Sequence, residues 1–211
     1  MSLRRFITVQ YLKWVFWILV SLRWISIVVE SAGEDGFAWR TAVLETGELA
    51  WILLIFTIFI SLLHKLFPRF WLFCNLLPLR KHTGIFAFLI AVSHGVFQFL
   101  RMGIARDVPA MIRTAFSTED AMVLGSVSVL IMLPLFIMSA DRIVARMGYR
   151  AWKRFQRVAH VAFIAAALHI ALIGYFAGRG VEWGPIALLG VYGLGYAYLW
   201  IRRWLAGKQG H

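Results

Sequence analysis

The chain has 211 residues, of which 61% are hydrophobic, 16% aromatic and 15% charged. A soluble domain carries about 25% charged residues, and the mean hydropathy of +0.76 is typical of a membrane protein. The net charge of +12 does not indicate nucleic-acid binding, because the basic residues stand at the ends of apolar segments instead of forming one tail or face. The single Cys74 excludes an intramolecular disulfide framework and a C-x-x-C metal or redox site.

Six apolar segments approach or exceed the roughly 20 residues that a helix needs to cross about 30 Å of hydrocarbon. The first is too long, and is interrupted by Arg23, so it is not typical of a signal peptide. The sequence therefore predicts an all-α membrane protein, with one domain over residues 1–211 and six transmembrane helices. In chain order the predicted spans are 10–29, 48–66, 83–100, 121–140, 157–177 and 183–202.

The distribution of Lys and Arg predicts the orientation of these spans. Sixteen of the 22 basic residues fall on one side, five fall on the other, and Arg23 lies within the first span. The positive-inside rule places the sixteen, and with them both termini, in the cytoplasm. Nine of the ten acidic residues fall on the opposite side.

Arg23 is unusual because a cation inside a span costs about 2.5–3.5 kcal/mol even on insertion-based scales. Its helix is expected to turn it toward a partner, for which a haem propionate, a quinone carbonyl or a cavity open to the cytoplasm are the alternatives. Glu30 lies on the same face, about 10 Å further along the helix.

His94 and His169 are the candidate metal ligands. His94 follows His82 by twelve residues, about 18 Å of helix, and His169 follows Arg157 by the same number. Because the third and fifth spans run parallel, the two imidazoles are expected at matching depth, beyond the midplane toward the exterior. This suits axial ligation of one b-type haem iron between helices 3 and 5. A packing role, with each His satisfied by a carbonyl or a neighbouring helix, is the alternative.

Three further residues are candidates for cofactor binding. Arg101 lies seven residues after His94, where it would suit a haem propionate, or it is an ordinary snorkelling Arg at a helix end. His160 and His82 lie at similar depth near the cytoplasmic side, where either could join a second, inner haem, with His160 as a further iron ligand. For His82 a hydrated interfacial role is the alternative, and for His160 the sequence favours neither.

Three stretches resemble, in order, blocks of the ferric reductase-like transmembrane domain family: ETGELAWILLIFTIFISLL, LRKHTGIFAFLIAVSHG and RMGYRAWKRFQRVAHVAFIAAALH. Within it they look most like the MsrQ type, the haem-binding membrane subunit of a periplasmic methionine sulfoxide reductase system. The resemblance runs from about residue 40 to about 200. The matching positions are Thr46, Gly47, Arg80, Lys81, Gly84, His94, Gly148, Trp152 and His169.

One position departs from the family pattern. Gln156 stands where the pattern W-x-x-L-H has its first fifth-span His, and His160 lies one turn further on. The resemblance therefore implies one haem b at His94 and His169, and a second only if His160 takes the place of the missing ligand. The departure also leaves open whether electrons enter by the family's inner route.

The resemblance implies an electron-transfer subunit of the bacterial inner membrane. Its donor is expected to be quinol or a separate cytoplasmic flavin reductase, so a quinone or FMN is a further expected cofactor. Its acceptor is expected to be a periplasmic molybdenum-containing reductase that repairs oxidised methionine. Whether the chain is itself an enzyme is left open. The sixteen cytoplasmic cations suit an acidic flavoprotein or anionic membrane lipid.

Other functions remain open. A ferric or metal reductase component would differ only in its acceptor. A small transporter would use Arg23 and the histidines along a substrate path, but we find no inverted repeat and no paired Gly/Pro-broken half-helices. A haem-free scaffold would leave the depth-matched histidines unexplained.

Overall fold

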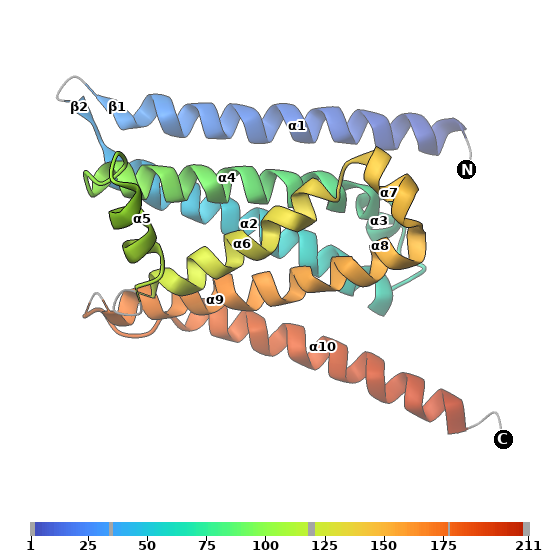
Figure 1. The fold of residues 1–211 in the computed structure, drawn as a ribbon. Coiled ribbons are helices and arrows are strands. Elements are labelled where there is room, and N and C mark those ends of the chain that lie inside the picture. The colour runs from blue at the N-terminus through green and yellow to red at the C-terminus, as the bar shows by residue number, and fades with distance from the viewer. Residues whose placement is uncertain (1–2, 34–35, 118–120, 177, 209–211) are drawn as a thin grey trace.

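The computed structural model describes residues 3–33, 36–117, 121–176 and 178–208, which form a helical bundle with one short hairpin (Figure 1). Its strands β1 (Ala32–Gly33) and β2 (Gly36–Phe37) pair antiparallel. The α-helices are α1 (Leu3–Ser31), α2 (Trp39–Leu66), α3 (Trp71–Leu76), α4 (Arg80–Arg101), α5 (Val108–Ala115), α6 (Met122–Ile137), α7 (Asp141–Met147), α8 (Tyr149–Phe155), α9 (Ala159–Phe176) and α10 (Trp183–Lys208). Two 3₁₀ turns, η1 (Leu77–Leu79) and η2 (Gln156–Val158), lead into α4 and α9.

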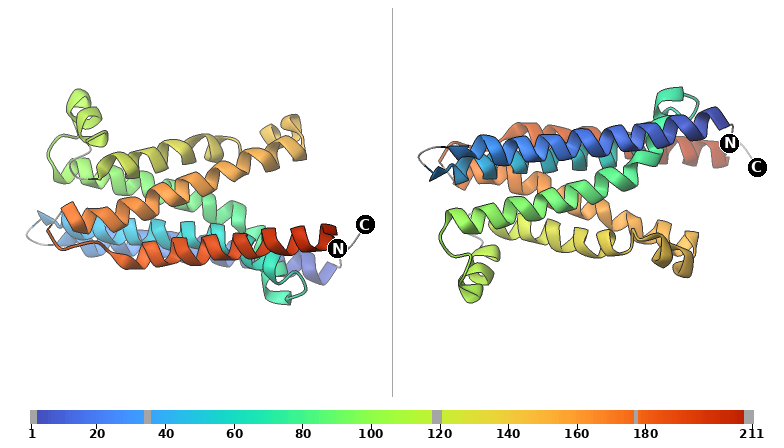
Figure 2. Two further views of the ribbon diagram at one scale, coloured as in Figure 1. Left: turned by 90° about the horizontal axis from the view of Figure 1, so that it is seen from below. Right: turned by 90° about the horizontal axis from the view of Figure 1, so that it is seen from above.

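Four helices form the centre of the bundle, and α1 and α10 flank it. The most extensive packing joins α2 to α4 and α6 to α9. Figures 1 and 2 show α1 and α10 on the outside, along opposite flanks of these two pairs. Large apolar side chains on the flanking helices, such as Trp14 and Leu194, are exposed. This is the pattern of helices whose outer faces contact lipid instead of water.

Small residues and hydroxyls allow the central helices to approach closely. Ala162 of α9 is completely buried, and its carbonyl accepts a hydrogen bond of 2.9 Å from the Ser128 hydroxyl of α6. Between α2 and α4, the Thr57 hydroxyl donates to Thr83 Oγ1 over 2.8 Å. Such contacts are the usual means of joining helices in lipid, where burial of apolar surface provides no net drive.

Aromatic packing fixes the middle of the core. The indole of Trp51 on α2 stacks on the ring of Phe163 on α9, with 5.3 Å between ring centroids. Phe163 also meets Tyr192 of α10 at 5.4 Å, so one buried ring holds three helices in register. Phe88 of α4 and Phe136 of α6 stack at 4.8 Å on the other side of the centre.

Five helical stretches within the described residues are long and apolar enough to cross a membrane: Val9–Ser31, Trp39–Leu66, Trp71–Arg101, Arg150–Phe176 and Trp183–Ala206. They contain four of the six predicted spans and all of a fifth, 157–177, except residue 177, which lies outside the described residues. The fourth prediction, 121–140, corresponds to the 16-residue helix α6. At 1.5 Å per residue α6 covers about 24 Å, less than the usual hydrocarbon thickness. The chain is therefore a multi-pass membrane protein, and a membrane span at 121–140 stays a prediction.

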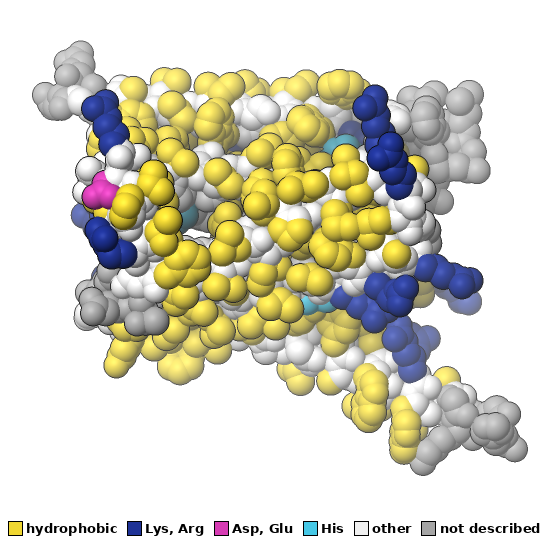
Figure 3. All heavy atoms as spheres, in the orientation of Figure 1, with side chains coloured by type: hydrophobic (Ala, Val, Ile, Leu, Met, Phe, Trp, Pro, Cys, Tyr) yellow, Lys and Arg dark blue, Asp and Glu magenta, His cyan; other side chains and the backbone are white. Residues whose placement is uncertain are grey.

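The two ends of the bundle differ in charge. The start of α1 and the end of α10 lie at the same end as α3, α7 and α8 (Figure 1), which we call the basic end. The other end, with β1, β2 and α5, is the hairpin end. Figure 3 shows hydrophobic side chains over the middle of the molecule. Basic side chains gather mainly at the basic end, and an acidic side chain lies at the hairpin end. Assignment of the basic end to the cytoplasm stays a prediction.

Replacement of Ala162 by Leu tests the close approach of α6 and α9. We expect Ala162→Leu to lower stability by about 1–3 kcal/mol, because the larger side chain has no space in a fully packed contact. The measurement is thermal unfolding of the purified protein in detergent. Ala197→Leu on the exposed side of α10 is the control, and equal melting temperatures for the two variants would contradict this packing.

Candidate functional site

His94 is held against α2 by a hydrogen bond and a glycine. Its Nδ1 donates to the carbonyl oxygen of Val43 over 2.8 Å. A carbonyl oxygen can only accept, so Nδ1 carries the hydrogen and Nε2 keeps its lone pair. The ring lies against Gly47, where an added Cβ would come within 2.9 Å of both Nδ1 and Cε1.

His169 is held against α6 in the same way. Its Nδ1 donates to the carbonyl oxygen of Ala121 over 2.9 Å. An added Cβ at Gly125 would lie 3.1–3.2 Å from three atoms of the imidazole. His169 is therefore also the Nδ1–H tautomer, with a lone pair on Nε2.

The two histidines lie on helices α4 and α9, which run in the same direction (Figure 1). Each has one nitrogen bonded to backbone and one available as a neutral metal ligand. Metal-binding His commonly has this second hydrogen bond, which fixes the tautomer and the ring orientation. The fixed nitrogens are what a bis-imidazole site for haem iron requires.

His82 has a different environment. Trp17 of α1 donates its indole N–H to His82 Nδ1 over 3.1 Å, and the two rings meet edge to face. Because Nδ1 accepts here, a neutral His82 carries its hydrogen on Nε2. In this arrangement it joins α1 to α4, and its predicted part in a second haem stays a prediction.

His160 and Gln156 contact different neighbours. The His160 ring packs against Tyr192 and Tyr196 of α10, with centroids 5.8 and 5.7 Å away. Its buried Nδ1 bonds to no group among the described residues. Gln156 instead lines a cavity of about 60 Å³ between the central helices, together with Arg80 and Lys81. His160 is not part of the lining, and its predicted replacement of the family His stays a prediction.

The two candidate arginines have protein partners. Arg23 binds Glu45 of α2 at 2.5 Å and Glu30 of its own helix at 3.5 Å. Two long side chains thus close the expected 10 Å gap between Arg23 and Glu30. Arg101 is exposed at the end of α4 and donates from Nε to Gln98 Oε1 over 3.1 Å. Cofactor binding by either arginine stays a prediction.

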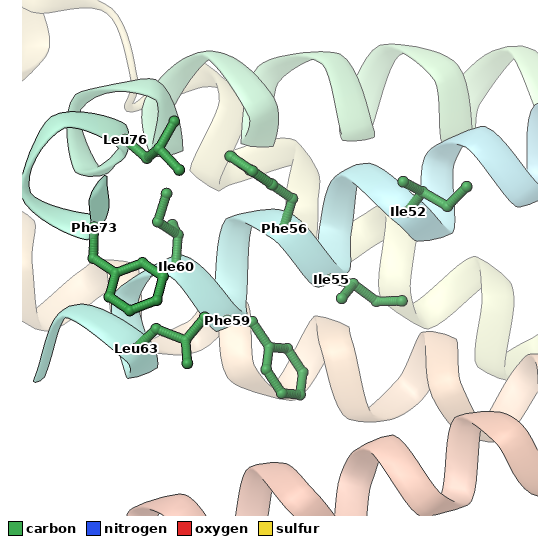
Figure 4. Close-up of a pocket in the computed structure, with 8 residues that line it drawn as sticks. All are labelled: Ile52, Ile55, Phe56, Phe59, Ile60, Leu63, Phe73 and Leu76. Atoms are coloured by element: carbon green, nitrogen blue, oxygen red, sulfur yellow. The ribbon is translucent and has the colours of Figure 1, made fainter. Parts of the chain in front are cut away.

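An open groove of about 290 Å³ runs along α2 and is lined only by apolar side chains. Figure 4 shows Phe73 and Leu76 of α3 reaching toward the α2 residues Phe56, Ile60 and Leu63. None of the candidate histidines lines it. Across the described residues, we find no cluster of three or more His, Cys, Asp or Glu placed to hold a metal ion.

Comparison with known proteins identifies the family of the chain. A model of the ferric reductase like transmembrane component matches residues 46–167, more than half of the chain. The chain belongs to this family. The match begins at Thr46, beside Gly47, and includes His94, whereas His169 lies two residues beyond its end. The family relationship indicates a membrane component of electron transfer.

One curated protein is also similar. The magnetosome protein MamZ of Magnetospirillum gryphiswaldense is 29% identical over 98 residues, which are 46% of this chain and 15% of MamZ. The similarity therefore spans only a small part of that relative. No solved structure matches the chain significantly.

Sequence reasoning missed the groups that hold the imidazoles. The acceptors are the backbone carbonyls of Val43 and Ala121, and any residue type supplies a carbonyl. Gly125 had no signal of its own in the sequence, although Gly47 stood in a matched motif. Spacing alone could place the histidines at one depth but could not show how they are oriented.

The hydrogen bonds predict two tautomers within one protein. We expect ¹⁵N NMR of imidazole-labelled, haem-free protein to show protonated Nδ1 for His94 and His169, and protonated Nε2 for His82 in its neutral form. Signals are assigned by the loss of one peak in each His→Ala variant. Trp17→Phe should change the His82 signal alone, and a protonated Nε2 on His94 would contradict the site geometry.

Proposed function

We propose that this protein is a haem b electron-transfer subunit, in which His94 and His169 would hold one haem. The observation that carries the proposal is the pair of Nδ1–H bonds to backbone carbonyls, which leaves a lone pair on Nε2 of both His94 and His169. When bound there, haem b would supply a one-electron couple. Two neutral imidazoles bring no charge of their own into the membrane.

The protein's residues support this role without taking part in bond chemistry. α2 and α6 orient the rings through the carbonyls of Val43 and Ala121. Arg101 lies on the same helix as His94, at the hairpin end, and its exposed guanidinium is available for a carboxylate such as a haem propionate. Arg23 is already neutralised by Glu45 and Glu30, so we assign it to the α1–α2 contact.

The proposed direction of electron flow is from the basic end to the hairpin end. The cations at the basic end form a surface for an acidic flavin reductase, or for quinol entering from anionic lipid. At the opposite end the proposed acceptor is a periplasmic molybdenum-containing reductase that acts on oxidised methionine. These partners, and the bacterial inner membrane as location, rest on the sequence resemblance to the MsrQ type.

A second candidate is a ferric or metal reductase component. The description of the matched family favours it, and it needs the same haem site. The two functions separate by acceptor. The protein, reduced with dithionite and freed of excess reductant, would be reoxidised either by a chelated ferric ion or only by the molybdenum-containing partner.

Removal of either imidazole tests the haem site. We expect His94→Ala and His169→Ala each to abolish the reduced-minus-oxidised haem b signal, because six-coordinate ligation needs both rings. Haem per chain is measured as the pyridine haemochrome. His64→Ala is the control, since His64 lies near Cys74 at the end of α2. Wild-type spectra in both site variants would rule out this assignment.

Replacement of His160 by Ala tests whether a second haem is present. If the wild-type protein carries two haems per chain, we expect the variant to lose one, because its Nδ1 or Nε2 would be an iron ligand. If the wild type carries one, we expect no change, because His160 then only packs on Tyr192 and Tyr196. Loss of the single haem in this variant would contradict ligation by His94 and His169.

A further inference from the structure

We propose that Gly47 and Gly125 are positioning residues for the two imidazoles. In this proposal the carbonyl four residues before each glycine sets how strongly the ring donates to iron. The inference rests on the proposed haem function and deepens it, because it names the groups that would adjust the redox potential of the site.

The same arrangement occurs twice in the fold. On α2, Val43 supplies the carbonyl and Gly47 the surface for His94. At the start of α6, Ala121 supplies the carbonyl and Gly125 the surface for His169. Val43 and Gly47 lie one turn apart on the same face of α2, whereas Ala121 directly precedes the first residue of α6. In both places the glycine lets the imidazole lie against the backbone and reach the carbonyl.

The contacts leave no space for a methyl group at either glycine. At Gly47 a Cβ would stand 2.9 Å from two ring atoms, and at Gly125 it would stand 3.1 Å from the nearest. A helix with glycine in its interior is less stable than the same helix with alanine there, so the glycines at positions 47 and 125 need a reason. Contact with a histidine ring supplies that reason, and Gly47 is the tighter of the two.

Ala121 gives a third sign that this geometry is specific. Its φ is +56°, and it is the one non-glycine residue with positive φ among those the structure describes. Such a conformation persists where the surroundings enforce it. The Ala121 carbonyl accepts from both His169 Nδ1 and the backbone N–H of Leu124. The strained residue thus directs a carbonyl at the imidazole just before α6 begins.

The hydrogen bond has a chemical consequence at the opposite nitrogen. A carbonyl that accepts from Nδ1–H raises the basicity of Nε2. A more basic ligand favours the ferric over the ferrous state and so lowers the reduction potential. A ring pushed away from its carbonyl should therefore bind haem more weakly and show a higher potential.

Three glycine variants test the inference. We expect about 10-fold weaker haem retention for Gly47→Ala, within the range for loss of such supporting contacts, and a smaller loss for Gly125→Ala. Haem that remains in either variant should titrate at a more positive midpoint potential. Gly190→Ala on α10 has open space around the new methyl group and should match the wild type in both measurements.

Ala121 provides a conservative pair. Ala121→Gly accepts positive φ without strain and should keep the wild-type potential, whereas the β-branched Ala121→Val should raise it. Circular dichroism and gel filtration establish that each variant folds. Haem content and potentials equal to the wild type in both Gly47→Ala and Ala121→Val would overturn the proposal.

The haem-free protein separates this proposal from the function on which it rests. In ¹⁵N spectra, Gly47→Ala should reduce the Nδ1–H population of His94 and leave that of His169 unchanged. An unaltered His94 tautomer would count against the positioning role even if haem binds. Wild-type protein that never takes up haem would overturn the proposed function instead, and with it the redox part of this inference.

Discussion

The structure depends on how two imidazoles are accommodated inside an apolar bundle. A polar group without a partner is costly in such a place, which favours a hydrogen bond to at least one nitrogen of each ring. The backbone satisfies Nδ1 of both His94 and His169. Each ring keeps a lone pair on Nε2, and a neutral imidazole nitrogen is a good metal ligand.

The helix packing follows from this constraint. α2 with α4, and α6 with α9, are the two most closely packed pairs, and each pair contains one histidine and the carbonyl that holds it. The buried stack of Trp51 on Phe163 joins one pair to the other. Trp51 lies one turn after Gly47, so its stack with Phe163 is adjacent to the glycine that contacts His94. α1 and α10 add apolar cover, and the Arg23–Glu45 pair attaches α1 beside this region.

The sequence predicted the all-helical fold and five of the long spans well, because hydrophobic length is a direct consequence of bilayer thickness. Its placement of His94 and His169 at one depth stays a prediction. It could not show that α6 is only 16 residues long, since an apolar run continues past the residue where the helix ends. It placed Glu30 too far from Arg23, because helix rise ignores the reach of long side chains. Residue type does not reveal which backbone carbonyls accept from the imidazoles. It also does not reveal the left-handed conformation of Ala121, which directs one of these carbonyls.

The measurement that tests the central claim most directly is the dithionite-reduced minus oxidised spectrum of the purified wild-type protein, with haem quantified per chain. We expect the sharp α-band of six-coordinate, bis-imidazole haem b, and at least one haem per chain. Protein that stays colourless after expression with added haem would contradict haem binding. His94 and His169 would then be packing residues, held by the carbonyls of Val43 and Ala121.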